Sequence, residues 1–116
     1  MKTENLTQKK CQPCEGIGQP LTKEQADGYL KNTPKWQIQD GAIHREFIMK
    51  DFLAAVSLIN KIAKVAQEDN HHPDIHLTGY RKLRVELSTH AVKGLTENDF
   101  ILAAKINELP ADLKSP

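Results

Sequence analysis

Residues 67–99 read QEDNHHPDIHLTGYRKLRVELSTHAVKGLTEND. In this stretch a helix-like run ends before His71 and His72, Pro73 follows, and two alternating runs then lead to His90. Proline restricts the residue before it to extended conformations, so the chain is expected to change from helix to strand here. Imidazole titrates near neutral pH, and this group of histidines is therefore a candidate for acid–base chemistry.

The two alternating runs predict a pair of strands joined by a turn. Apolar residues recur at every second position around 75–77 and again over 83–87, with 79–82 as the turn. A period of two places Thr89 on the apolar face of the second run and His90 on the opposite face. We therefore expect His90 to point away from the core.

A first helix is predicted over 22–32. Thr22 and Gln25 have the spacing of a capping box, and Leu21 is placed for the apolar contact that often accompanies it. Pro34 ends this helix.

Asp40-Gly41 separates two alternating runs, at 36–39 and 43–48, and this dipeptide between such runs is typical of a hairpin. Apolar residues then recur at helical spacing over 51–68, which predicts the longest amphipathic helix. We expect this helix to lie across the sheet.

The last helix is predicted to begin at Thr96, which can cap the backbone while Asp99 occupies the third helical position. Leu95 can contact Phe100 beside the cap, and Pro110 ends the helix. The resulting order is α-β-β-α-β-β-α. Short connections then predict an α+β fold, with a four-stranded antiparallel sheet and three α-helices packed on one face.

The chain has 116 residues, which fits a single domain over 21–110, with an arm over 1–20 and a tail over 111–116. Its 16 basic and 15 acidic residues give a net charge of +1, which favours neither nucleic acid nor a membrane surface as partner. No apolar run approaches the roughly 20 residues of a membrane helix, and the first ten residues lack a secretory signal. We expect a cytoplasmic protein whose partner is a neutral small molecule or another protein.

Cys11 and Cys14 form a CQPC motif in the amino-terminal arm. A zinc site needs four ligands, and no second pair lies nearby. A thioredoxin-like dithiol normally follows a strand, and no strand pattern precedes these residues. Metal and redox roles remain open, but we expect two thiols in an irregular arm and assign no chemistry to them.

The histidines also have other interpretations. Histidines at a helix end often bind exposed carbonyls, and a Thr-x-x-Asp start gives Asp99 a capping role in any protein. His71, His72 and His76, followed by His90, also offer four imidazoles to a metal, although His76 and His90 fall on different predicted strands. A helix end, a strand end and a helix cap can meet at one rim of a sheet, which would bring His71, His72, His90 and Asp99 together.

The motifs NHHP (70–73), LSTH (87–90) and GLTENDF (94–100) resemble those of the pterin-4a-carbinolamine dehydratase family, the 4a-hydroxytetrahydrobiopterin dehydratases. The resemblance covers residues 21–109. It implies the same sheet and helices, a homodimer or homotetramer, and a hydro-lyase that takes part in tetrahydrobiopterin recycling.

The implied reaction removes water from 4a-hydroxytetrahydropterin, the pterin-4a-carbinolamine, and gives quinonoid dihydropterin. This elimination delivers a proton to the departing hydroxyl and takes one from a ring nitrogen, which two imidazoles can do. The motif positions imply that His71 and His90 are the acid–base pair, in either order, and that His72 binds the pterin and assists. No metal and no further cofactor are expected, because the pterin is the substrate.

Three further residues are candidates for substrate binding. Asp99 matches the family's carboxylate and is expected to orient a histidine or the pterin, and Tyr80 offers an aromatic face to a flat heterocycle. Gln67 departs from the family pattern, which usually has an ionisable residue four positions before the first histidine. A glutamine hydrogen-bonds but carries no charge, so its role here stays open.

Two alternatives to this enzyme remain. One is a noncatalytic protein-binding role, as in animal relatives that act as a dimerisation cofactor of a transcription factor. The other is action on a different pterin, for example in molybdenum-cofactor metabolism. If the protein is the dehydratase, the resemblance implies a pathway link to an aromatic amino acid hydroxylase. No direct nucleic-acid or membrane partner is expected.

Overall fold

The computed structural model describes residues 3–11 and 19–115, and its elements follow the expected order. The elements are the 3-10 helix η1 (Thr3–Gln8), α1 (Lys23–Leu30), β1 (Gln37–Gln39), β2 (Ala42–Ile48), α2 (Phe52–Asp69), β3 (Asp74–Thr78), β4 (Lys82–Leu87), the 3-10 helix η3 (His90–Val92) and α3 (Glu97–Asn107).

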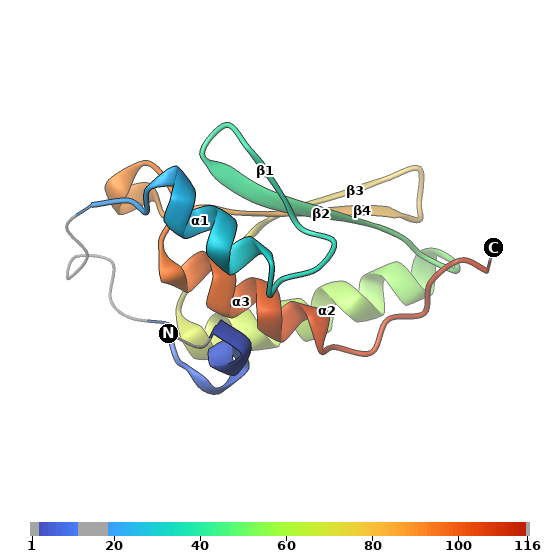
Figure 1. Cartoon of the computed structure of the whole chain (residues 1–116). Helices are drawn as coiled ribbons and strands as arrows, with labels where there is room; N and C mark the ends of the chain where they lie inside the picture. Colours follow the sequence, from blue (N-terminus) through green and yellow to red (C-terminus); the bar gives the residue numbers. More distant parts are fainter. Residues whose placement is uncertain (1–2, 12–18, 116) are drawn as a thin grey trace.

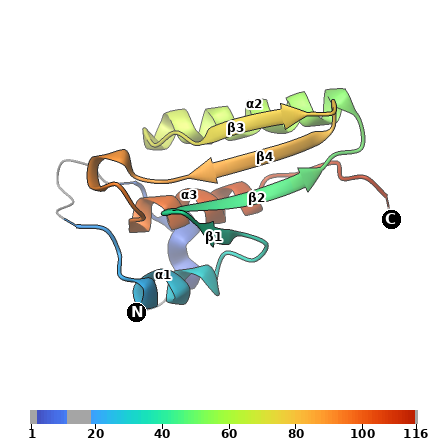
Figure 2. The same cartoon turned by 90° about the horizontal axis from the view of Figure 1, so that it is seen from above.

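The four strands form one antiparallel sheet with the order β1-β2-β4-β3. In Figure 1, α2 and α3 lie beneath the sheet, and Figure 2 shows α3 passing beneath β2. The first helix, α1, packs against α3, where the ring of Tyr29 stacks on Phe100 with 5.2 Å between the ring centroids. The predicted α+β fold class is confirmed.

The core lies between the sheet and the helices because β2 and β4 bury alternate residues. Ile43 is paired with Leu87 and Phe47 with Leu83, and all four side chains are buried. Glu46, on the opposite face of β2, is exposed. This alternation is the period of two seen in the sequence.

Local capping and turn signals explain where several elements begin. The capping box of α1 is present: the backbone N–H of Gln25 donates to Thr22 Oγ1 over 3.2 Å, and that of Thr22 donates to Gln25 Oε1 over 2.9 Å. Between β1 and β2, Asp40 and Gly41 both have positive φ, 53° and 75°, as a tight Asp-Gly hairpin turn requires. Both predictions are confirmed.

Two elements differ from the sequence pattern. β4 ends at Leu87, and His90 begins the 3-10 helix η3 instead of closing the strand, because the N–H of Val92 donates to Thr89 O over 3.2 Å. Trp36 lies just before β1, where it is 3% exposed and its Nε1 donates to Asn107 Oδ1 over 2.8 Å. The indole therefore packs in the core.

The amino-terminal arm is more ordered than the sequence indicated. Its residues Thr3–Gln8 form the 3-10 helix η1, and Leu6 is 1% exposed within the core. A single apolar residue among polar neighbours has no period, so this packing gave no sequence signal. Cys11 is buried against the domain, whereas Cys14 lies outside the described residues.

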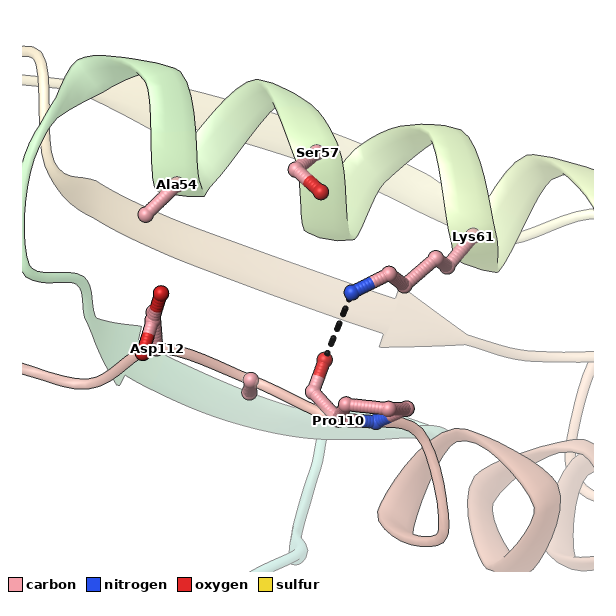
Figure 3. A pocket seen from close by; sticks show the side chains of 6 residues that line it. Ala54, Ser57, Lys61, Pro110 and Asp112 are labelled. Atoms are coloured by element: carbon pink, nitrogen blue, oxygen red, sulfur yellow. Dashed lines mark hydrogen bonds between the residues drawn. The ribbon is translucent and has the colours of Figure 1, made fainter.

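The carboxyl-terminal tail pairs with the connection between β2 and α2. Leu113 forms a β-bridge with Met49, and the N–H of Lys50 donates to Asp112 O over 2.8 Å. Figure 3 shows the tail beside α2, where Lys61 Nζ donates to Pro110 O over 3.3 Å. An open cavity of about 200 Å³ lies between the tail and α2.

Candidate active site

His71 and Asp99 form a buried pair at the junction of three elements. The chain leaves α2 through Asn70, whose backbone is left-handed with φ 51°, and this turn directs His71 toward α3. His71 Nε2 lies 2.7 Å from Asp99 Oδ1, and the two side chains are 6% and 0% exposed. An ionised carboxylate only accepts hydrogen bonds, so Nε2 carries the proton and Nδ1 is left for chemistry.

The second oxygen of Asp99 is held by donors from either side of the η3 turn. Thr89 Oγ1 donates to Asp99 Oδ2 over 2.9 Å, and the backbone N–H of Thr96 donates to it over 3.0 Å. The two threonine hydroxyls are 2.8 Å apart. Asp99 therefore caps α3 as the sequence predicted, and the same carboxylate orients His71.

Thr89 is a site residue that the sequence argument missed. The strand period places it on the face of Leu83, Val85 and Leu87, and the structure buries it there with 1% exposure. A hydroxyl on a buried face needs a hydrogen-bond partner, and this requirement was the available signal. Its partner is the carboxylate that holds the central imidazole.

Beside this pair lies an open pocket of about 220 Å³. It is lined by Asn70, His71, His72, Ser88, His90 and Ala91. His71 closes the buried side, whereas His72 and His90 are exposed at the rim. The pocket thus gathers the three histidines that the sequence singled out.

The sheet register explains why these histidines meet. Asp74 at the start of β3 is paired with Glu86 near the end of β4, so the residues before β3 and after β4 lie at one end of the hairpin. His72 and His90 come from those two segments. The predicted convergence at one rim follows from this antiparallel pairing.

Gln67 joins the group, but Tyr80 does not. Gln67 Oε1 lies 3.2 Å from His72 Nε2, one turn before the end of α2. Tyr80 is 57% exposed in the turn beyond the Thr78–Lys82 pair, at the opposite end of the hairpin. Four strand positions, ~13 Å, separate the two ends, so the single chain does not bring Tyr80 to this pocket.

The four-imidazole metal arrangement does not form within the described part of the chain. His76 is on the exposed side of β3, where its Nε2 lies 3.6 Å from Glu86 Oε1. Across residues 3–11 and 19–115, no three His, Cys, Asp or Glu side chains are grouped as metal ligands would be.

The cavity in Figure 3 has different chemistry. Ser57 and Lys61 of α2 line it opposite the tail residues Pro110 and Asp112, and no imidazole lines it. Without a group that titrates near neutral pH, this cavity is less suited to proton transfer than the histidine pocket.

The small α+β domain has three imidazoles around one pocket, and a buried carboxylate holds one of them, which is an arrangement suited to acid–base chemistry on a small molecule. Comparison with known proteins shows the family. The family model described as Pterin 4 alpha carbinolamine dehydratase matches residues 19–109. The chain belongs to this family, whose members are hydro-lyases.

Individual relatives agree with the family assignment. A protein of Nitrosomonas eutropha that carries the dehydratase name is 44% identical, over 90% of this chain and 93% of the relative. Pterin-4-alpha-carbinolamine dehydratase 2, mitochondrial, of Arabidopsis thaliana is 38% identical, over 93% of this chain and 60% of its own length.

The described residues include no helix long and apolar enough to cross a membrane.

A solved structure shares the fold. It is the transcriptional coactivator/pterin dehydratase from Brucella melitensis, with a TM-score of 0.71 and 34% sequence identity. The match covers 76% of this chain and 95% of the Brucella chain.

Proposed function

We propose that this protein dehydrates 4a-hydroxytetrahydropterin to quinonoid dihydropterin and water. The observation that carries the proposal is the buried His71–Asp99 pair in a pocket that His72 and His90 also line. The family match supports the substrate class. The reaction needs no further cofactor, because the pterin itself is transformed.

The surroundings of the two catalytic histidines support different roles. Asp99 accepts from Nε2 of His71, which leaves the Nδ1 lone pair to take a proton from a ring nitrogen of the pterin. The same carboxylate stabilises the imidazolium formed in that step. His90 is exposed at the rim, where it exchanges protons with solvent, and it delivers the proton that leaves with the 4a hydroxyl as water.

His72 and Gln67 form the binding side of the proposed site. Both side chains are exposed, and the 3.2 Å contact between them holds the imidazole at the pocket rim. A neutral glutamine amide both donates and accepts, so it suits the mixed donor and acceptor edge of a pterin. His72 is expected to affect substrate binding more than the proton transfers.

The test follows the decay of enzymatically generated 4a-hydroxytetrahydropterin by stopped-flow absorbance. The unmodified protein should accelerate the decay, and the double variant His71→Ala/His90→Ala should lose at least about 100-fold in kcat, because each proton transfer contributes 10²- to 10⁴-fold. His76→Ala is the matched control, since this exposed histidine lies outside the pocket. It should retain full activity.

Two other results would redirect the assignment. Unchanged decay in the presence of the folded protein would contradict the dehydratase and favour another pterin or the coactivator role named for the Brucella relative. Full activity of the double variant would contradict the histidine mechanism. The family resemblance also supports a homodimer or homotetramer, which light scattering of the purified protein would measure.

A further inference from the structure

Asp69 is an acidic residue in an unfavourable place. It is the last residue of α2 and is 6% exposed, although the carboxyl end of a helix disfavours negative charge and burial removes hydration. Conflict between a local preference and the fold is expected where a residue serves the site. Asp69 lies two positions before His71.

Lys105 compensates this buried charge. Its Nζ lies 2.6 Å from Asp69 Oδ2, and the two side chains are 20% and 5% exposed. Lys105 belongs to the last turn of α3, so the ion pair joins the ends of the two long helices. A charge-assisted bond of this length also restricts the direction of both side chains.

Cys11 covers the ion pair from the amino-terminal arm. Its Sγ lies 3.8 Å from Asp69 Oδ2 and donates to Asn98 O over 3.5 Å. Burial, together with the charge of Asp69, raises the pKa of the Cys11 thiol to about 12, so the thiol stays neutral. It limits water access to the pair without adding a second negative charge.

The end of α2 is thus attached to α3 at two points. His71 binds Asp99 near the start of α3, and Asp69 binds Lys105 six residues further along, ~9 Å along the helix axis. Either bond alone would attach the end of α2 to α3 at one point only. Two bonds separated along α3 determine both its position and its tilt.

We propose that Asp69 and Lys105 are positioning residues for the acid–base chemistry, acting through His71. Their ion pair holds the α2–β3 junction so that the His71 ring keeps its bond to Asp99 and presents its free nitrogen to the pocket. This role rests on the proposed function only for its effect on turnover. Its effect on the geometry of His71 is independent of the reaction.

The test compares Lys105→Met with Lys105→Arg. Methionine keeps much of the length without the charge, whereas arginine restores the pairing. The readouts are the ring nitrogen and Nε2–H resonances of His71 in two-dimensional NMR, together with kcat and KM. A matched control is Lys9→Met, which removes a second 2.6 Å ion pair, to Glu97, that also joins a side chain to α3.

Lys105→Met should shift the His71 ring resonances and leave those of exposed His76 in place. It should lower kcat by about 10- to 100-fold with a smaller change in KM, since misplacement of a catalytic group by about 1 Å has effects of this size. Lys105→Arg should restore both readouts, and Lys9→Met should change neither. If Lys105→Met does not fold, the double variant Asp69→Leu/Lys105→Met removes the pair without leaving a buried charge.

Unchanged His71 resonances in folded Lys105→Met, or in the double variant, would overturn the proposal. An equal shift in Lys9→Met would also overturn it, because the effect would then be general loosening of α3. If the unmodified protein does not dehydrate the carbinolamine but Lys105→Met still shifts the His71 resonances, positioning stands and the proposed function fails.

Discussion

The two carboxylate oxygens of Asp99 have different roles, one at the start of α3 and one at the candidate active site. Oδ2 accepts from Thr96 N–H at the start of α3 and from Thr89, while Oδ1 holds His71. A fully buried carboxylate is tolerated only when its lone pairs are used, and here three donors use them. The same carboxylate therefore caps α3 and orients His71. A change at any of its three donors is expected to affect both the helix cap and the orientation of His71.

Thr89→Val is predicted to destabilise the protein. Valine keeps the shape of threonine but removes the hydroxyl that donates to Asp99, so a buried acceptor loses a partner. The free energy of unfolding should fall by about 1–3 kcal/mol in urea titrations. Thr78→Val, at an exposed position of β3, is the control and should change it by less than about 0.5 kcal/mol. Equal effects of the two changes would contradict this account.

The junction between α2 and β3 decides where the histidines point. Asn70 takes a left-handed conformation, its N–H binds the carbonyls of Ala66 and Gln67, and the N–H of His71 donates to Ala66 O over 3.2 Å. These bonds end the helix and reverse the chain within one residue. Pro73 then keeps the chain extended into β3.

Asn70 substitutions test this helix end. Asn70→Ala should lower the free energy of unfolding by about 1 kcal/mol, because a Cβ without a local hydrogen-bonding group disfavours the left-handed region. Asn70→Gly should retain stability close to that of the unmodified protein, since glycine adopts positive φ freely. Guanidinium unfolding of both variants measures the difference. Greater loss with glycine than with alanine would show that φ is not the controlling factor.

The described part of the amino-terminal arm packs against the helices of the domain. Leu6 packs in the core, Lys9 Nζ binds Glu97 Oε2 over 2.6 Å, and Cys11 lies against Asp69. Residues at the start of the chain therefore contact the segments that carry His71 and Asp99. Because Cys11 touches Asp69, changes at this one contact are expected to affect the site, whereas changes at the Lys9–Glu97 pair are not.

Alkaline pH should lower the free energy of unfolding through the buried thiol of the arm. The pKa of Cys11 is raised from its ordinary 9.0 to about 12 by burial and by Asp69, so the unfolded chain releases this proton first. The contribution of the thiol is complete below pH 9 and decreases as the pH rises toward 12, with a slope of at most about 1.4 kcal/mol per pH unit. Urea unfolding between pH 8 and 10 should show a steeper loss for the unmodified protein than for Cys11→Ala. Equal slopes would contradict a buried neutral thiol.

The elements were predictable from the sequence because their signals are local. The Thr22–Gln25 capping box, the Asp40-Gly41 turn and the helical period over 51–68 each involve residues a few positions apart. Alternation also placed His90 away from the core. Helices and strands therefore appeared in the expected order, with boundaries that differ by few residues.

The contacts around the site were decided by the tertiary structure. Thr89 with Asp99, Asp69 with Lys105, and the burial of Leu6 join residues that no shared period connects. The same holds for Tyr80, which is close to the histidines in sequence but is carried away by the hairpin. The sequence by itself determined the elements and the residue types at the rim, because these depend on local backbone and capping interactions. Only the packing of α2, α3 and the sheet determined which of those residues meet, because hydrogen bonds between distant segments depend on how the chain folds in space.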